Sequence, residues 1–223
     1  MPVISLVSSK GGVGKTTSTV VLAGEFAAAG RKVVLIDADP NRPLEAWSRL
    51  RPLPDKLSVM VDDSAETIID TIEDARAGAD FVIVDLEGTA TDRIGFAVAR
   101  SDMVLIPLQS SVLDAAEAAK SVKLVRQMWR VANREIPYRV FFTRVPPAIR
   151  ERTARHIERQ FADAAIPALP ATLIDRAAYR TLFSLGGTLH ELESSDVSGL
   201  DSAKENAREY AQAVINAIRG GVA

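Results

Sequence analysis

Residues 8–17 read Ser-Ser-Lys-Gly-Gly-Val-Gly-Lys-Thr-Thr and lie between a short apolar run and a stretch of helical periodicity. Glycines allow the backbone to turn its N–H groups toward an anion, and the positive end of the following helix points at the same place. Lys15 then offers a charge to the β- and γ-phosphates, and the hydroxyl of Thr16 offers a ligand to Mg²⁺. The segment therefore predicts a phosphate-binding loop for ATP or GTP with Mg²⁺.

The loop departs from the general pattern Gly-x4-Gly-Lys-Ser/Thr. That pattern places its first glycine at position 9, where this chain has Ser9, and the loop carries an additional Lys10. A glycine-rich turn with a chance lysine and threonine is the alternative interpretation. The strand, loop and helix expected around the segment favour the phosphate-binding interpretation.

Short runs rich in Val, Ile and Leu alternate with helical stretches along the whole chain, before and after the loop. Strands are predicted at residues 3–7, 32–36, 57–61, 81–84, 103–108 and 138–142, and more weakly at 168–172. Helices are predicted at residues 15–29, 64–77, 114–132 and 201–218, with one further basic helix after residues 138–142. The pattern predicts one α/β domain over residues 1–223, with a mostly parallel central sheet and helices on both faces.

The composition of the 223-residue chain excludes several classes of protein. With 47% hydrophobic residues, 25% charged residues and a net charge of −2, the chain is expected to fold as a compact, soluble domain. The absence of cysteine excludes disulfides, thiolate zinc sites and clusters ligated by its own thiols. Neither a secretory signal nor a run of about 20 apolar residues is present, so a cytoplasmic location is expected.

Three aspartates stand at the ends of predicted strands. Asp37 and Asp39 follow residues 32–36, and Asp85 follows residues 81–84. Ligands of open α/β sheets bind at the carboxyl ends of the strands, so these aspartates and the loop are expected to converge on one crevice. Each aspartate taken alone has an alternative interpretation as a helix cap or turn former.

Three motifs in order resemble the ParA/MinD family of deviant-Walker P-loop ATPases. They are the octamer at residues 10–17, the segment Leu-Ile-Asp-Ala-Asp-Pro-Asn at 35–41, which is similar to the family's second acidic motif, and Val-Ile-Val-Asp at 82–85, which is similar to its Walker B strand. The resemblance covers most of the chain. It implies a Mg²⁺-dependent ATPase whose hydrolysis is slow and stimulated by a partner.

The resemblance also implies roles for individual residues. Lys10 would reach across an ATP-sandwich dimer to the partner's phosphates, and Asp39 would position the attacking water. The catalytic residues would be Lys10, Lys15 and Asp39. The metal would be held by Thr16, Asp37 and Asp85. The nucleotide would be bound by Lys10, Gly11, Gly12, Val13, Gly14, Lys15, Thr16 and Thr17, with Thr143, Arg144 and the loop around Ile174 and Asp175 bordering the base. Each of these last four has an ordinary alternative as a strand-end or capping residue.

The segment after Asp85 departs from the family, which has proline or small residues there. This chain reads Leu-Glu-Gly-Thr-Ala at residues 86–90. A carboxylate near a triphosphate repels it unless the carboxylate points away or joins the metal shell. The role of Glu87 therefore stays open between coupling to a partner and a solvated loop carboxylate.

A basic region is hidden by the nearly neutral net charge. Residues 120–180 hold thirteen Lys/Arg against five Asp/Glu, about +8, which leaves about −10 for the rest of the chain. The helix at 114–132 is expected to place a cationic stripe opposite an apolar side that includes Trp129 and Val131. Such faces suit sequence-tolerant contact with DNA phosphates, with a solvated face as the alternative. The candidate DNA-binding residues are Lys120, Lys123, Arg126, Arg130, Arg150, Arg152, Arg155 and Arg159.

The function implied by the resemblance is that of a small ParA-type ATPase for partition or positioning. It would form a homodimer with ATP, bind nonspecific duplex DNA of the nucleoid, and be released when a ParB-like or other adaptor stimulates hydrolysis. Its cargo would be a plasmid or chromosome partition complex or a large protein assembly. The chain begins almost at its first strand, so the N-terminal DNA-binding domain of longer ParA proteins is not expected.

Two alternatives remain from the sequence. A MinD-like membrane-associated ATPase is disfavoured because the last ten residues carry one arginine and no bulky aromatic residue. An ATP-dependent metabolic synthetase of the same fold would leave the basic helix unexplained.

Overall fold

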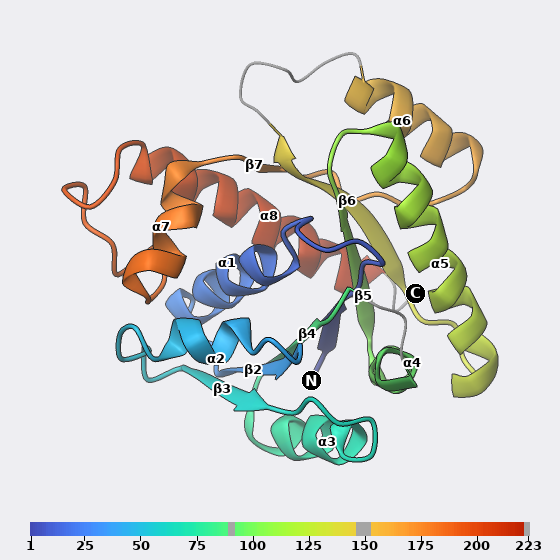
Figure 1. Ribbon diagram of the computed structural model, residues 1–223, viewed down its shortest axis with the longest axis horizontal. Helices are drawn as coiled ribbons and strands as arrows, with labels where there is room; N and C mark the ends of the chain where they lie inside the picture. Colours follow the sequence, from blue (N-terminus) through green and yellow to red (C-terminus); the bar gives the residue numbers. More distant parts are fainter. Residues whose placement is uncertain (89–91, 146–152, 221–223) are drawn as a thin grey trace.

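The computed structural model describes residues 1–88, 92–145 and 153–220. In these residues one sheet has the strand order β3-β2-β4-β1-β5-β6-β7, and every pairing is parallel (Figure 1). The strands are β1 (Val3–Leu6), β2 (Val33–Ala38), β3 (Leu57–Val61), β4 (Phe81–Leu86), β5 (Met103–Leu108), β6 (Tyr138–Val145) and β7 (Leu173–Ile174). The predicted α/β fold with a parallel central sheet is confirmed.

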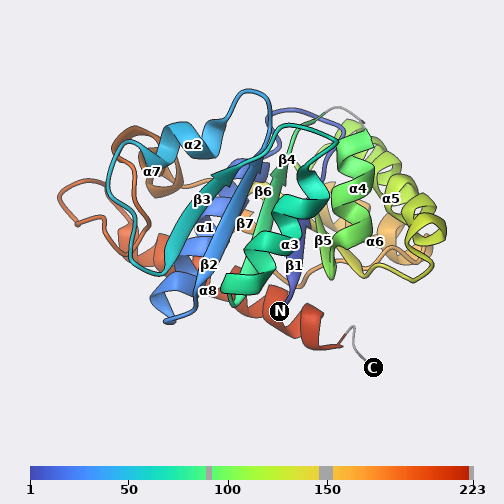
Figure 2. The same ribbon diagram turned by 90° about the horizontal axis from the view of Figure 1, so that it is seen from below.

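Helices cover both faces of the sheet (Figure 2). One face carries α1 (Lys15–Ala28), α2 (Pro43–Ser48), α7 (Ala177–Leu185) and α8 (Leu200–Gly220). The other carries α3 (Ile68–Gly78), α4 (Asp92–Arg100), α5 (Val112–Ala132) and α6 (Thr153–Asp163). Strand residues alternate between the two cores, with Ile83 in the first and Val82 and Val84 in the second. Burial on both faces explains why these strands are apolar without interruption. No helix in the described ranges is long and apolar enough to cross a membrane.

The seventh strand differs from its prediction. Residues 168–172 were expected to form it, but β7 is Leu173–Ile174, and Ala168 makes only an isolated bridge to Val140 of β6. Pro167 and Pro170 flank that bridge and lack the N–H group that a continuous ladder requires. Pairing with β6 therefore resumes only beyond Pro170.

The helix predictions need three corrections. The helix expected at 64–77 begins at Ile68, because Asp62 accepts hydrogen bonds from the N–H of Ser64 and the hydroxyl of Thr67, which hold the preceding residues in a turn. Val131, expected on the packed side of its helix, is 65% exposed, whereas Trp129 and Ala132 of the same turn pack against the core, so Val131 lies on the outer side of α5. Helices α2, α4 and α7 were not predicted. They are short, and their stability comes from packing, as with the fully buried Trp47 of α2.

Candidate functional site

A crevice of about 590 Å³ opens where the loop between β1 and α1 meets the segments that follow β2 and β4. Gly12 and Gly14 of that loop have φ angles of +74° and +95°, a conformation that favours glycine. Helix α1 begins directly afterwards at Lys15, so the positive end of its dipole faces the crevice. The described residues that line it are Ser9, Gly11, Gly12, Gly14, Lys15, Thr16, Thr17, Asp39, Asn41, Pro43, Gly88, Arg144 and Phe183.

The register of the sheet places two buried acidic side chains next to each other near this crevice, and Asp39 lines it. Asp37 of β2 and Asp85 of β4 are direct neighbours on adjacent parallel strands, and Asp39 follows β2. The hydroxyl of Thr16 donates a hydrogen bond to Oδ2 of Asp85 at 2.6 Å. Oδ2 of Asp37 accepts one from the backbone N–H of Glu45 at 2.8 Å. The structure thus places Thr16, Asp37 and Asp85 beside one another, where the first turn of α1 meets the ends of β2 and β4.

Burial dominates the electrostatics of Asp85 and Lys15. Desolvation raises the pKa of Asp85 to about 7, although the hydrogen bond from Thr16 and the charge of Lys15 act in the opposite direction. Oδ1 of Asp85 is buried and has no hydrogen-bond partner among the described residues. Burial also lowers the pKa of Lys15, against the opposing charges of Asp85, Asp39 and Glu87. A buried carboxylate oxygen without a partner, next to a hydroxyl, suits a hard divalent cation such as Mg²⁺.

We expect Asp85→Asn to stabilise the nucleotide-free protein at neutral and higher pH. The folded pKa of Asp85 lies above its unfolded value, so its contribution to stability is complete below pH 4 and is lost as the pH rises through 7. The melting temperature of the variant should exceed that of the unmodified protein by on the order of 5 °C at pH 8, with the difference shrinking toward pH 4. Thermal unfolding over this pH range measures it, with the exposed Asp55→Asn as the control. A difference that does not vary with pH would contradict the raised pKa.

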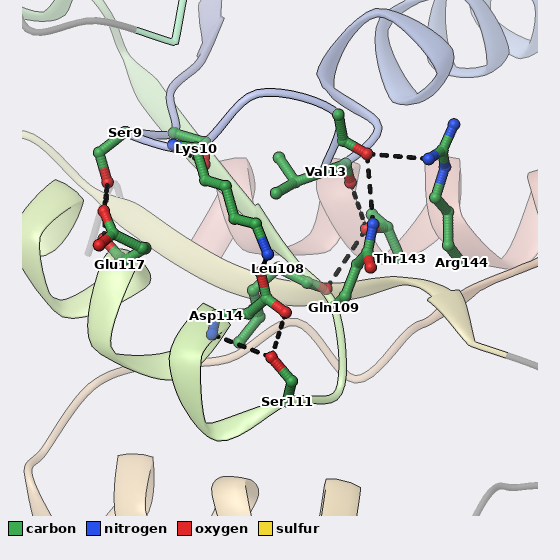
Figure 3. A network of polar contacts seen from close by, with 12 residues as sticks. Ser9, Lys10, Val13, Leu108, Gln109, Ser111, Asp114, Glu117, Thr143 and Arg144 are labelled. Atoms are coloured by element: carbon green, nitrogen blue, oxygen red, sulfur yellow. Dashed lines mark hydrogen bonds and ion pairs between the residues drawn. The ribbon is translucent and has the colours of Figure 1, made fainter.

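The first residues of the loop are bound to α5 (Figure 3). Nζ of Lys10 lies 2.7 Å from Oδ1 of Asp114, whose side chain is buried, whereas that of Lys10 is 43% exposed. The hydroxyl of Ser9 donates to Oε2 of Glu117 at 2.7 Å. Asp114 was not predicted as a site residue. One pattern in the sequence did mark Asp114: it stands three residues after Ser111, in the Ser-x-x-Asp spacing of a helix cap. Ser111 caps α5 by accepting a hydrogen bond from the N–H of Asp114.

The opposite side of the loop is bound by the ends of β5 and β6 (Figure 3). Nη1 of Arg144 donates to the carbonyl of Gly12 at 2.9 Å, Nε2 of Gln109 donates to the same carbonyl at 3.2 Å, and the hydroxyl of Thr143 donates to the carbonyl of Val13. A cavity of about 310 Å³ adjoins this contact. It is lined by Gly14, Thr17, Ser18, Thr143, Arg144, Leu173, Ile174, Asp175, Tyr179, Arg180 and Phe183.

This cavity collects all four residues that were expected near the base, together with five residues that were not predicted for the site. Thr143, Arg144, Ile174 and Asp175 line it, and Ser18 and Leu173 line it beside them. Tyr179, Arg180 and Phe183 come from α7, a short helix that was not predicted, so no pattern in the sequence indicated their position.

The cationic residues of α5 fall into two groups. Arg126 donates to the hydroxyl of Tyr138 and lies over its ring, 5.7 Å from the centroid, and Lys120 forms an ion pair with Glu117 at 2.6 Å. Lys123 and Arg130 are exposed and have no ion pair in the part of the chain that the structure describes. On α6, Arg159 is exposed. Arg150 and Arg152 lie outside the described residues, as does the side chain of Arg155.

Comparisons with known proteins found relatives that match most of the chain. Residues 1–219 match the family model described as VirC1 protein. The chain is 36% identical over 218 residues to Protein ParA of Rhizobium radiobacter, with 98% of each chain covered. It is 29% identical over 191 residues to Protein virC1 of Rhizobium rhizogenes, covering 83% of this chain and 82% of that protein.

Two solved structures are similar in fold. The MinC:MinD cell division protein complex of Aquifex aeolicus has a TM-score of 0.77 at 19% identity and covers 97% of this chain and 96% of that one. The septum site-determining protein MinD complexed with Mg-ADP, from Pyrococcus horikoshii OT3, has a TM-score of 0.69 at 17% identity and covers 96% and 95%. At such identities the likeness is one of fold alone.

Proposed function

Because this chain belongs to the VirC1 family, within the ParA/MinD-type ATPases of partition and positioning, we propose that it positions a cargo on DNA through an ATP-dependent dimer. The observation that carries the proposal is the crevice that Lys15, Thr16 and Asp39 line at the positive end of α1, with Thr16 hydrogen-bonded to the buried Asp85 beside Asp37. A crevice of that composition suits a nucleoside triphosphate with a divalent cation.

The residues of the crevice would divide the work of phosphoryl transfer. Lys15 and the first N–H groups of α1 bind the β- and γ-phosphates, and Asp39 orients a water in line with the γ-phosphate. Thr16, Asp37 and Asp85 hold Mg²⁺, which supplies positive charge against the phosphate oxygens. Because such a transfer needs positioning more than covalent help, these few side chains suffice for slow hydrolysis.

The cavity beside Thr143 would take the base. Thr143 and Arg144 already contact the carbonyls of the phosphate loop, so a nucleotide whose phosphates lie on that loop extends its base toward them. Asp175 lines the same cavity and is paired with Arg180, and its second carboxylate oxygen offers an acceptor to the exocyclic amino group of a purine base.

Lys10 would be the residue that joins two copies. In this chain alone it lies on Asp114, but its side chain is nearly half exposed, and Asp114 keeps the hydrogen bond from the hydroxyl of Ser111 when Lys10 leaves. We assign it to the phosphates of the second copy, so that dimerisation depends on ATP. The control of hydrolysis by an adaptor protein then acts on this dimer.

The surface for DNA would be the cationic side of α5. Lys123 and Arg130 project from it without ion pairs among the described residues, and Lys120 and Arg159 extend the positive charge. Arginine and lysine on a helix face contact phosphates without reading bases, which favours nonspecific binding to the nucleoid. The cargo would be a partition complex or another large assembly.

The test is the binding of duplex DNA by the purified protein with ATP, with ADP and without nucleotide, together with its mass in solution. We expect a dimer with ATP alone, DNA binding by that dimer, and a log affinity that falls with log salt by about 0.9 for each phosphate contacted. Lys10→Ala should bind ATP as a monomer and lose DNA binding, while the exposed Lys56→Ala should behave like the unmodified protein.

Two results would count against the proposed function. Absence of DNA binding in both mass states would reject the proposal. Binding of the ATP form to anionic vesicles in place of DNA would favour a membrane-associated positioning ATPase.

A further inference from the structure

Glu87 continues from β4, two positions after Asp85, and its carboxylate is engaged by α4. Its Oε1 lies 2.6 Å from Nη2 of Arg93. The side chains are 15% and 7% exposed, so both charges are largely removed from water. A buried pair of this kind is held together firmly, because removal of one partner leaves an uncompensated buried charge.

Arg93 also connects this segment to the loop between β3 and α3. Its Nη1 donates a hydrogen bond to the backbone carbonyl of Asp63. The carboxylate of Asp63 in turn accepts from Nη2 of Arg42 at 3.0 Å, and Arg42 stands just beyond Asp39 on the segment after β2. The guanidinium of Arg93 therefore connects the residues that follow β3 and β4, and that of Arg42 connects those that follow β2 and β3.

The segment around Glu87 lies against the phosphate loop. A Cβ atom placed on Gly88 would be 3.3 Å from the backbone nitrogen of Gly11, so the two backbones already approach closely. The charge of Glu87 is also felt at Lys15, whose pKa it raises. A triphosphate bound by Lys15 therefore lies within the electrostatic reach of this carboxylate, and like charges repel.

We propose that Arg93 is a positioning residue for ATP: it neutralises Glu87 and fixes the carboxylate on α4, which permits residues 86–88 to lie against the phosphate loop with a triphosphate bound. The inference rests on the nucleotide site proposed above. Its effect is specific to the γ-phosphate, because the additional phosphate group of ATP brings additional negative charge, which Glu87 repels more strongly without the opposing charge of Arg93.

The experiment is a double-mutant cycle on this pair. Calorimetry with Mg²⁺ measures the affinity of Arg93→Gln for a non-hydrolysable ATP analogue and for ADP. We expect the affinity for the analogue to fall about tenfold or more and that for ADP by less than about threefold. The double variant Glu87→Gln with Arg93→Gln carries no charge at either position and should regain the affinity for the analogue to within about threefold.

Rescue by the second substitution shows that the charge of Glu87 causes the loss of affinity. The smaller loss for ADP separates this positioning role from a purely structural one, which would weaken the binding of both nucleotides alike. Arg100→Gln removes the same charge from an exposed site on α4 and should change neither affinity. Thermal unfolding of each variant without nucleotide verifies that it folds. If Arg93→Gln proves unstable, the affinities of Glu87→Gln and of the double variant still test the inference. Glu87→Gln leaves the positive charge of Arg93 unopposed by Glu87, so this variant should bind the analogue more tightly than the double variant does, with a smaller difference for ADP.

The inference would be overturned if Arg93→Gln weakened the binding of the analogue and of ADP equally, or if the double variant did not regain affinity for the analogue. Either result would leave the proposed function intact. Failure of the unmodified protein to bind either nucleotide would instead remove the proposed function, so the two failures are distinguishable.

Discussion

Replacement of Lys15 by alanine is expected to lower the affinity for ATP by at least about a hundredfold, or ~2.7 kcal/mol. Lys15 is only 8% exposed and stands at the first turn of α1, where the N–H groups of the helix also point into the crevice. Its ammonium group is already desolvated, so a phosphate gains a strong contact without the cost of stripping water from it. The nucleotide-free variant should be at least as stable as the unmodified protein, because a buried charge has been removed.

Calorimetric titration with Mg-ATP measures this effect, and thermal unfolding without nucleotide verifies the fold. Lys56→Ala is the matched control, since it removes the same side chain from an exposed site outside the crevice. If Lys15→Ala bound ATP as tightly as the control, the phosphates could not lie at the start of α1, and the assignment of the crevice would be wrong.

The second large effect is expected from Lys123→Glu combined with Arg130→Glu on α5. These side chains are exposed without ion pairs in the described part of the chain, so they are free to contact phosphates. The double variant should lose about a hundredfold or more in DNA affinity at physiological salt, and the slope of log affinity against log salt should fall by about 2. ATP binding and the ATP-dependent change in mass should be unaffected.

The matched control reverses the charge of Arg208 and Arg219, which are exposed on α8. The control has the same net charge as the α5 variant, so any difference between them reports the location of the charge and not its total. Arg126→Gln should behave differently from both, with a lower melting temperature, because Arg126 contacts Tyr138. Equal DNA affinity in the α5 variant and the α8 control would reject the α5 surface.

The sequence alone determined the fold class, the family and the order of the motifs. These depend on local patterns: unbroken apolar runs for strands buried on both faces, glycines for the left-handed conformations at Gly12 and Gly14, and the lysine that begins α1. The convergence of Asp37 and Asp85 was also predictable, because parallel strands end at the same edge of a sheet. The family membership inferred from three short motifs is confirmed over residues 1–219.

Only the tertiary structure decided which partner each charged side chain has. Lys10 lies on Asp114, 104 positions away in the chain, and Glu87 lies on Arg93 of a helix that was not predicted. Short helices such as α4 and α7 are marginal by themselves, because their stability comes from the core on which they pack. A hydrogen bond or ion pair between distant residues depends on how those elements pack, and no local spacing in the sequence encodes that arrangement.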